Sequence, residues 1–81
     1  MNIDIYVSNI NRTKFISIKA GVDVATIQIT DPDYQDLSIY QRGTEITAGE
    51  RRIAFSSDEA IKAIENQGYY LHGASIQVQE N

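Results

Sequence analysis

The chain has 81 residues, a formal net charge of −4 and no cysteine, and 42% of its residues are hydrophobic. A chain of this length accommodates one hydrophobic core, so we expect a single domain, and the hydrophobic fraction excludes a disordered protein. The lack of cysteine excludes disulfide scaffolds and thiolate metal sites, and the acidic balance disfavours general binding to DNA or RNA, which needs clustered Lys and Arg.

Alternating, β-rich segments in the first thirty residues predict three strands. Residues 3–7 and 15–20 alternate apolar and polar side chains, and residues 9–12 have the composition of a turn between them. Residues 24–30 resume the same period after Gly21. The simplest interpretation is a hairpin through Gly21.

The middle of the chain predicts turns and short strands. Asp31-Pro32-Asp33 is a turn signal, because Pro presets its own φ and Asp side chains bond nearby backbone N–H groups. Residues 37–40 and 52–55 are predicted as short strands. Residues 42–44 and 48–50 are predicted as loops or hairpin tips.

An amphipathic helix over residues 56–68 is the clearest regular element. Ser56 and Glu59 form the Ser-x-x-Glu capping box at its start, and Gly68 is typical of a helix end. Its apolar stripe consists of Ala60, Ile61, Ala63 and Ile64. Residues 74–79 alternate and predict a closing strand. The predicted fold is therefore α+β, with a small antiparallel sheet and one helix packed on one face.

Both ends of the chain resemble RNA-recognition-motif domains. Ile5-Tyr6-Val7-Ser8-Asn9-Ile10 is similar to the first strand of that family. The run from Ile53 to Ile64, with Leu71-His72-Gly73 and Ile76-Gln77-Val78, is similar to its third strand, second helix and fourth strand. The resemblance implies a β-α-β-β-α-β, ferredoxin-like variant of the α+β class. It also implies a sheet face that stacks single-stranded RNA on aromatic side chains.

The resemblance is incomplete at the positions that contact RNA. Tyr6 takes the place of the first-strand aromatic, but the third-strand aromatic positions fall on Glu50 and Arg52. A carboxylate in place of a stacking ring would repel phosphate. The first helix of the family would fall on residues 13–20, which are few and β-branched, so strand and helix both stay open there.

Few residues carry catalytic chemistry. His72 is the only histidine, so two-His metal motifs are impossible. It is predicted in a turn over Tyr69–Gly73, before the last strand. Asp31, Asp33 and Asp36 lack the Gly and the distal Glu of an EF-hand loop, so a solvated turn is the simpler interpretation. We predict no enzymatic activity, no cofactor and no metal site.

The tyrosines and the uncovered sheet face predict where a partner binds. Tyr34 and Tyr40 flank the acidic turn, and exposed tyrosines among mixed charges favour a protein-binding surface, although tyrosine also suits half-buried strands. One helix covers one face of a sheet, so the functional surface is expected on the other face. The predicted partner-binding residues are Tyr6, Ser8, Asp33, Tyr34, Asp36, Glu50 and Arg52.

Three functions stay open at this point. The first is a protein-interaction module, in one form a phage or mobile-element inhibitor of the anti-CRISPR type, because nucleic-acid-handling host proteins present basic grooves that attract carboxylates. The second is an RRM-like domain that binds single-stranded RNA, and the third is a homo-oligomeric structural subunit. The absence of a signal peptide and of a long apolar run predicts a cytoplasmic protein without membrane contact.

Overall fold

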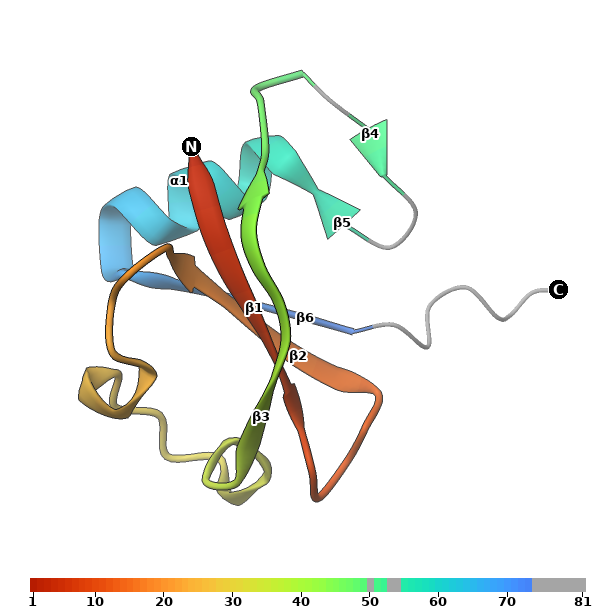
Figure 1. Ribbon diagram of the computed structural model, residues 1–81, viewed down its shortest axis with the longest axis vertical. Helices are drawn as coiled ribbons and strands as arrows, with labels where there is room; N and C mark the ends of the chain where they lie inside the picture. The colour runs from red at the N-terminus through yellow and green to blue at the C-terminus, as the bar shows by residue number, and fades with distance from the viewer. Residues whose placement is uncertain (50, 53–54, 74–81) are drawn as a thin grey trace, which may run out of the picture.

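The computed structural model describes residues 1–49, 51–52 and 55–73, and for residues 51, 52 and 55 it describes the backbone (Figure 1). The elements, in chain order, are β1 (Asn2–Ser8), β2 (Lys14–Lys19), the short 3-10 helices η1 (Val24–Thr26) and η2 (Pro32–Tyr34), β3 (Leu37–Glu45), β4 (Arg51–Arg52), β5 (Phe55–Ser56), α1 (Ser57–Gln67) and β6 (Tyr69–Gly73).

Four strands form an antiparallel sheet in the order β3-β1-β2-β6, and β4 and β5 pair as a separate two-stranded ribbon. The prediction of a small antiparallel sheet with one α-helix is confirmed. The strands predicted over residues 3–7 and 15–20 are confirmed as β1 and β2, so the helical alternative for residues 13–20 is wrong. A strand rather than a helix therefore occupies the place where the RNA-recognition-motif family has its first helix.

Local capping explains both ends of α1. The Ser56 hydroxyl accepts a hydrogen bond from the N–H of Glu59 (3.3 Å). Gly68 adopts a left-handed conformation (φ 94°), and its N–H donates to the C=O of Ile64 (2.9 Å). Ala60 and Ile64 are buried, so the predicted helix over residues 56–68 and its apolar stripe are confirmed.

The sheet has a hydrophobic cluster on each face. The face under α1 buries the odd-numbered side chains of β1 together with residues from three other segments; this cluster consists of Ile3, Ile5, Val7, Phe15, Ile46, Ala60 and Ile64. The opposite face buries Ile16, Ile18 and Tyr34, against which Tyr6, Val24, Ile27, Ile29, Leu37 and Tyr69 pack. Figure 1 shows α1 above the sheet, with η1 and η2 below it.

The segment of residues 20–36, which holds η1 and η2, forms the lower layer and corrects three predictions. Residues 24–30 do not form a strand, and no hairpin passes through Gly21. The cause is local, because the Asp23 carboxylate accepts the N–H of Ala25 (3.0 Å) and turns the chain into η1. The sheet face away from α1 is covered by this segment, so the predicted open face is wrong.

Three further predictions also change. The strand predicted over residues 37–40 continues through Glu45, so residues 42–44 lie in β3 and not in a loop. His72 lies in β6 and not in a turn. The strand predicted over residues 52–55 is divided between β4 and β5, with residues 53–54 outside the described residues, as are residues 74–79.

Candidate interaction surface

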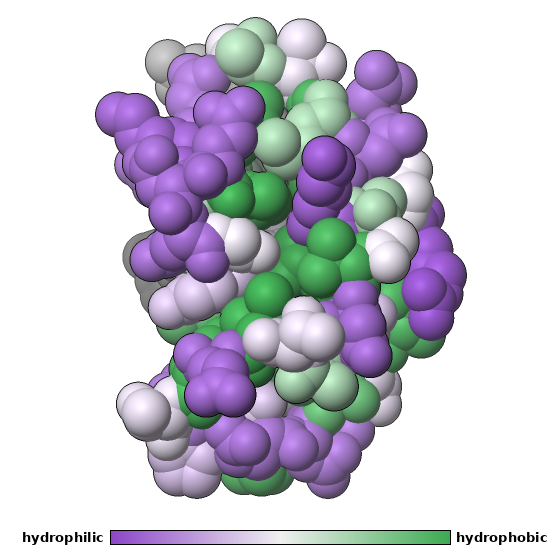
Figure 2. All heavy atoms as spheres, turned by 90° about the vertical axis from the view of Figure 1, so that its left-hand side faces the viewer, coloured by the Kyte–Doolittle hydropathy of each residue, from purple (hydrophilic) through white to green (hydrophobic). Residues whose placement is uncertain are grey.

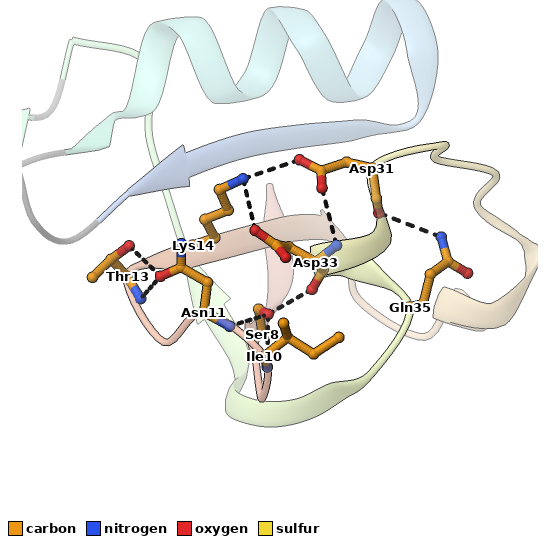
Figure 3. A network of polar contacts seen from close by, with 8 residues as sticks. All are labelled: Ser8, Ile10, Asn11, Thr13, Lys14, Asp31, Asp33 and Gln35. Atoms are coloured by element: carbon orange, nitrogen blue, oxygen red, sulfur yellow. Dashed lines mark hydrogen bonds and ion pairs between the residues drawn. The ribbon is translucent and has the colours of Figure 1, made fainter.

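A polar network fastens the segment of residues 20–36 to the end of β1 (Figure 3). The Ser8 side chain is fully buried, and its hydroxyl donates to the backbone C=O of Asp33. The same oxygen accepts the N–H groups of Ile10 (3.1 Å) and Asn11 (2.9 Å). One hydroxyl therefore serves three backbone groups, which is a structural role.

Lys14, at the start of β2, forms a second attachment for the same segment. Its ammonium lies 3.0 Å from a carboxylate oxygen of Asp31 and 3.0 Å from one of Asp33, and these two carboxylates raise the pKa of Lys14. The N–H of Asp33 and the Lys14 ammonium both lower the pKa of Asp31. The two carboxylates thus hold an ammonium of the same chain in place. In the described ranges, no group of three or more His, Cys, Asp or Glu could hold a metal ion.

The structure brings Ser8, Asp33 and Tyr34 together, but as an internal fastening. Tyr34 is buried, which raises the pKa of its hydroxyl, and Tyr6 is half-buried against the same cluster. Asp36 is exposed and accepts a hydrogen bond from the Asn9 side chain (3.0 Å). Arg52 lies in β4, and Glu50 lies outside the described residues.

We expect the Ser8→Ala substitution to lower the free energy of unfolding by about 1–3 kcal/mol, because it leaves three backbone groups without their partner. Limited proteolysis should then cut the segment of residues 20–36 earlier than in the wild type. The control is Ser38→Ala, since Ser38 is exposed. Equal denaturation midpoints for the Ser8 and Ser38 variants would contradict this structural role.

Ser17 and His72 form a hydrogen-bonded pair on the face under α1. The Ser17 hydroxyl lies 2.7 Å from Nε2 of His72, and Ser17 has no exposed surface. The His72 ring stacks with the rings of Phe15 (5.7 Å between centroids) and Tyr70 (5.3 Å). Burial lowers the pKa of His72 to about 4, so the imidazole is neutral at pH 7.

This burial predicts a pH dependence of stability. Unfolded His72 takes up a proton near pH 6.5, whereas folded His72 does so near pH 4, so the free energy of unfolding should fall as pH falls from 6.5 towards 4. The slope is at most about 1.4 kcal/mol per pH unit, and less because the ring is partly solvated. Urea midpoints at pH 7, 6 and 5 measure it. A His72→Gln variant should lack this component, and an unchanged slope in that variant would contradict the assignment.

Asp4 is a buried carboxylate that the sequence patterns did not indicate. It is 4% exposed, and its two oxygens accept the N–H of Gly43 (2.9 Å) and the N–H of Gly21 (3.2 Å). The Arg42 guanidinium lies 4.0 Å away. Gly43 has a positive φ of 63°, at a place where the register of β3 against β1 shifts. Asp4 therefore fixes the irregular part of β3.

The two edges of the sheet differ in regularity. β3 carries two register shifts against β1, and bulged edges resist the addition of another strand. β6 pairs with β2 over five consecutive residues without a shift. In the part of the chain that the structure describes, the outer side of β6 is the regular edge of the sheet.

Backbone hydrogen bonds define which groups of β6 point outward. The N–H of Ala20 donates to the C=O of Asn2 (2.9 Å), so the even-numbered residues of β1 and β2 face each other. The odd-numbered residues of β2 then face β6, where their partners are Tyr70 and His72. The N–H and C=O groups of Tyr69 and Leu71 therefore point away from the sheet.

The side chain of Gln67 is consistent with an outward C=O at Tyr69, because its amide donates a hydrogen bond to that oxygen (3.1 Å). A groove of about 510 Å³ lies between α1 and this edge. Residues of the helix and of β6 line it, namely Glu59, Lys62, Ala63, Asn66, Gln67, Tyr69, Tyr70 and Leu71. The outward backbone groups therefore lie beside this groove.

Hydrophobic surface accompanies the groove. Figure 2 shows hydrophobic side chains between hydrophilic ones on the side of the molecule that carries the end of α1, the start of β6 and the segment of residues 20–36. Leu71 is 39% exposed. Sequence reasoning missed this surface, because it predicted a turn over Tyr69–Gly73. A signal was present in Tyr69-Tyr70-Leu71, a β-prone run directly after a helix-ending glycine.

Within the described ranges, no helix has the length and apolar composition that crossing a membrane requires. Comparison with known proteins gave no match to a family model, to a curated protein or to a solved structure.

Proposed function

We propose that this chain is a non-enzymatic protein-interaction module that binds an extended segment of polypeptide along the outer edge of β6. The observation that carries this proposal is the edge itself. The N–H and C=O groups of Tyr69 and Leu71 point outward from a regular strand, beside the groove under α1. An extended segment would continue the sheet through backbone hydrogen bonds, and the groove would receive its alternate side chains.

Two observations favour polypeptide over RNA as the ligand. The RNA-binding alternative requires an open sheet face around Tyr6, and the segment of residues 20–36 covers that face. The groove contains one cation, Lys62, and one carboxylate, Glu59. Such a balance suits polypeptide, whereas a phosphate backbone needs several cations.

The narrower hypothesis, an inhibitor of the phage type acting on a nucleic-acid-handling host protein in the cytoplasm, stays a prediction. Described carboxylates lie on both layers of the fold, with Asp31 and Asp33 in the lower layer and Asp58 and Glu65 on α1. Asp31 and Asp33 are engaged with Lys14. Binding by strand addition does not require a concentrated acidic face.

A site-specific photocrosslinker tests the proposal. We expect a crosslinking residue in place of Lys62, in cells that make the chain, to give an adduct with a polypeptide segment. The Leu71→Pro substitution should abolish that adduct, because Pro removes an N–H that points outward and leaves the hydrogen bonds to β2 in place. A crosslinker in place of Ile39, which is exposed on β3, is the control.

Equal adducts from positions 62 and 39, or an RNA adduct, would contradict strand addition at β6. An adduct at position 62 that survives Leu71→Pro would do the same. The urea midpoint of Leu71→Pro verifies that this variant is folded. Leu71→Arg, which keeps the N–H but alters the exposed side chain, shows how much of the binding depends on side-chain contact.

A further inference from the structure

We infer that a second copy of this chain occupies the β6 edge, so that two copies form a symmetric dimer with one continuous eight-stranded sheet. This inference rests on the proposed function and names the polypeptide that the edge binds. A twofold axis requires each copy to present the same surface, so every contact must be self-complementary. The backbone, the charges and the apolar side chains beside β6 all meet that requirement.

The β6 strands of two copies can pair through their backbones when the twofold axis passes through Leu71. Two antiparallel copies of β6 then pair Leu71 with the Leu71 of the other copy, and Tyr69 with Gly73. The outward N–H and C=O groups fall on alternate residues, namely Tyr69, Leu71 and Gly73, so each pair exchanges two hydrogen bonds. No register shift interrupts β6 against β2, so the edge is straight enough for such pairing.

The same arrangement places charged side chains of α1 opposite side chains of the other sign on the second copy. The chain reverses at Gly68, so positions at equal distances from Gly68 on α1 and on β6 lie at the same level. Leu71 is about 10 Å from Gly68 along β6, and the same distance along α1 reaches Ile61 and Lys62. The axis therefore passes this part of the helix. An antiparallel second helix would bring Glu59 of one copy towards Lys62 of the other, and Lys62 towards Glu59. Both side chains line the groove and are exposed.

The spacing of the layers allows the two helices to meet. α1 packs over β6 and β2, while strands lie about 4.8 Å apart and packed helices about 8–10 Å apart. Two helices that each cover two strands of a continuous sheet are therefore neighbours. Below the sheet, the exposed Leu71 side chains meet at the axis beside Tyr69. The interface thus has an ionic upper layer, a hydrogen-bonded sheet and an apolar lower layer.

Sedimentation equilibrium from low micromolar to near-millimolar protein tests the inference. We expect the wild type to change from the mass of one chain to that of two. Glu59→Lys and Lys62→Glu should each weaken the dimer by about tenfold or more, because they place like charges opposite each other. The double variant Glu59→Lys/Lys62→Glu should restore wild-type association. Leu71→Pro should be a monomer with a wild-type fold by circular dichroism.

The outcomes separate this inference from the proposed function. A monomer at all concentrations, with a crosslink from position 62 to a different protein, overturns the dimer and leaves strand addition standing. A monomer without any position-62 crosslink overturns both. A dimer that Leu71→Pro does not dissociate, or that the charge exchange does not restore, overturns the β6 interface. Glu65→Lys, an exposed change on α1 outside the groove, is the matched control and should leave the mass unchanged.

Discussion

We expect the Asp4→Ala variant to lose about 2–4 kcal/mol of unfolding free energy, a large part of the stability of a small domain. The Asp4 carboxylate is 4% exposed and accepts the N–H groups of Gly43 and Gly21. Alanine leaves both N–H groups without this acceptor and removes the anion beside Arg42. Release from burying a carboxylate offsets part of the loss. Urea denaturation at pH 7 measures the difference.

Two control variants sharpen this test. Asp4→Asn keeps one acceptor oxygen but presents an NH₂ group to the second N–H, so we expect about half of the loss. Asp36→Ala removes an exposed carboxylate and should change stability by less than about 0.5 kcal/mol. An Asp4→Ala variant as stable as Asp36→Ala would show that Asp4 does not fix β3.

The second large effect is expected at Ile18, at the centre of the lower layer. Ile18 has no exposed surface and belongs to the cluster with Ile16 and Tyr34. Replacing it with alanine should lower the free energy of unfolding by about 2–5 kcal/mol, through lost burial and the cavity left behind. The same denaturation experiment measures it.

The matched control for Ile18 is Ile39→Ala. Ile39 has the same side chain but is 41% exposed on β3, so its loss should be below about 1 kcal/mol. Because the segment of residues 20–36 contributes Tyr34, Val24, Ile27 and Ile29 to the cluster that buries Ile18, a small effect at Ile18 would mean that this segment does not form a packed layer. It would also reopen the sheet face around Tyr6.

The elements that the sequence predicted correctly are those determined by residues close to one another in the chain. The helix over residues 56–68 was predicted from its capping serine, its apolar stripe and Gly68, all of which act within a few residues. The strands β1 and β2 were predicted from alternation, because half-buried strands bury every second residue. These elements gave the fold class.

The segment of residues 20–36 was mispredicted because alternating apolar and polar residues indicate which side chains are buried, and not whether the backbone pairs with another strand. Ile27 and Ile29 are partly buried while Gln28 and Thr30 are exposed, so the period of two is present without a strand. Asp23 and Asp31 turn the chain, and the Ser8 and Lys14 contacts that fasten it come from distant positions. A single sequence does not display such long-range contacts.

The candidate surface depended on topology in the same way. The predicted partner-binding residues include Ser8, Asp33 and Tyr34, and these three lie close together. Ser8 and Tyr34 are buried, and Ser8 and Asp33 make contacts that hold the segment of residues 20–36 against β1 and β2. Which strand becomes the sheet edge follows from the order β3-β1-β2-β6, and residue patterns alone do not specify that order. The β6 edge was therefore visible only in the structure.

The central claim is that the outer edge of β6 binds a polypeptide strand, and amide hydrogen exchange resolved by residue tests it most directly. In the dilute chain, we expect the outward amide of Leu71 to exchange much faster than the inward amide of Tyr70. In the concentrated chain, or in the complex captured through position 62, the Leu71 amide should become protected while that of Leu37 on β3 does not change. A Leu71 amide that exchanges equally fast in every sample would contradict the claim.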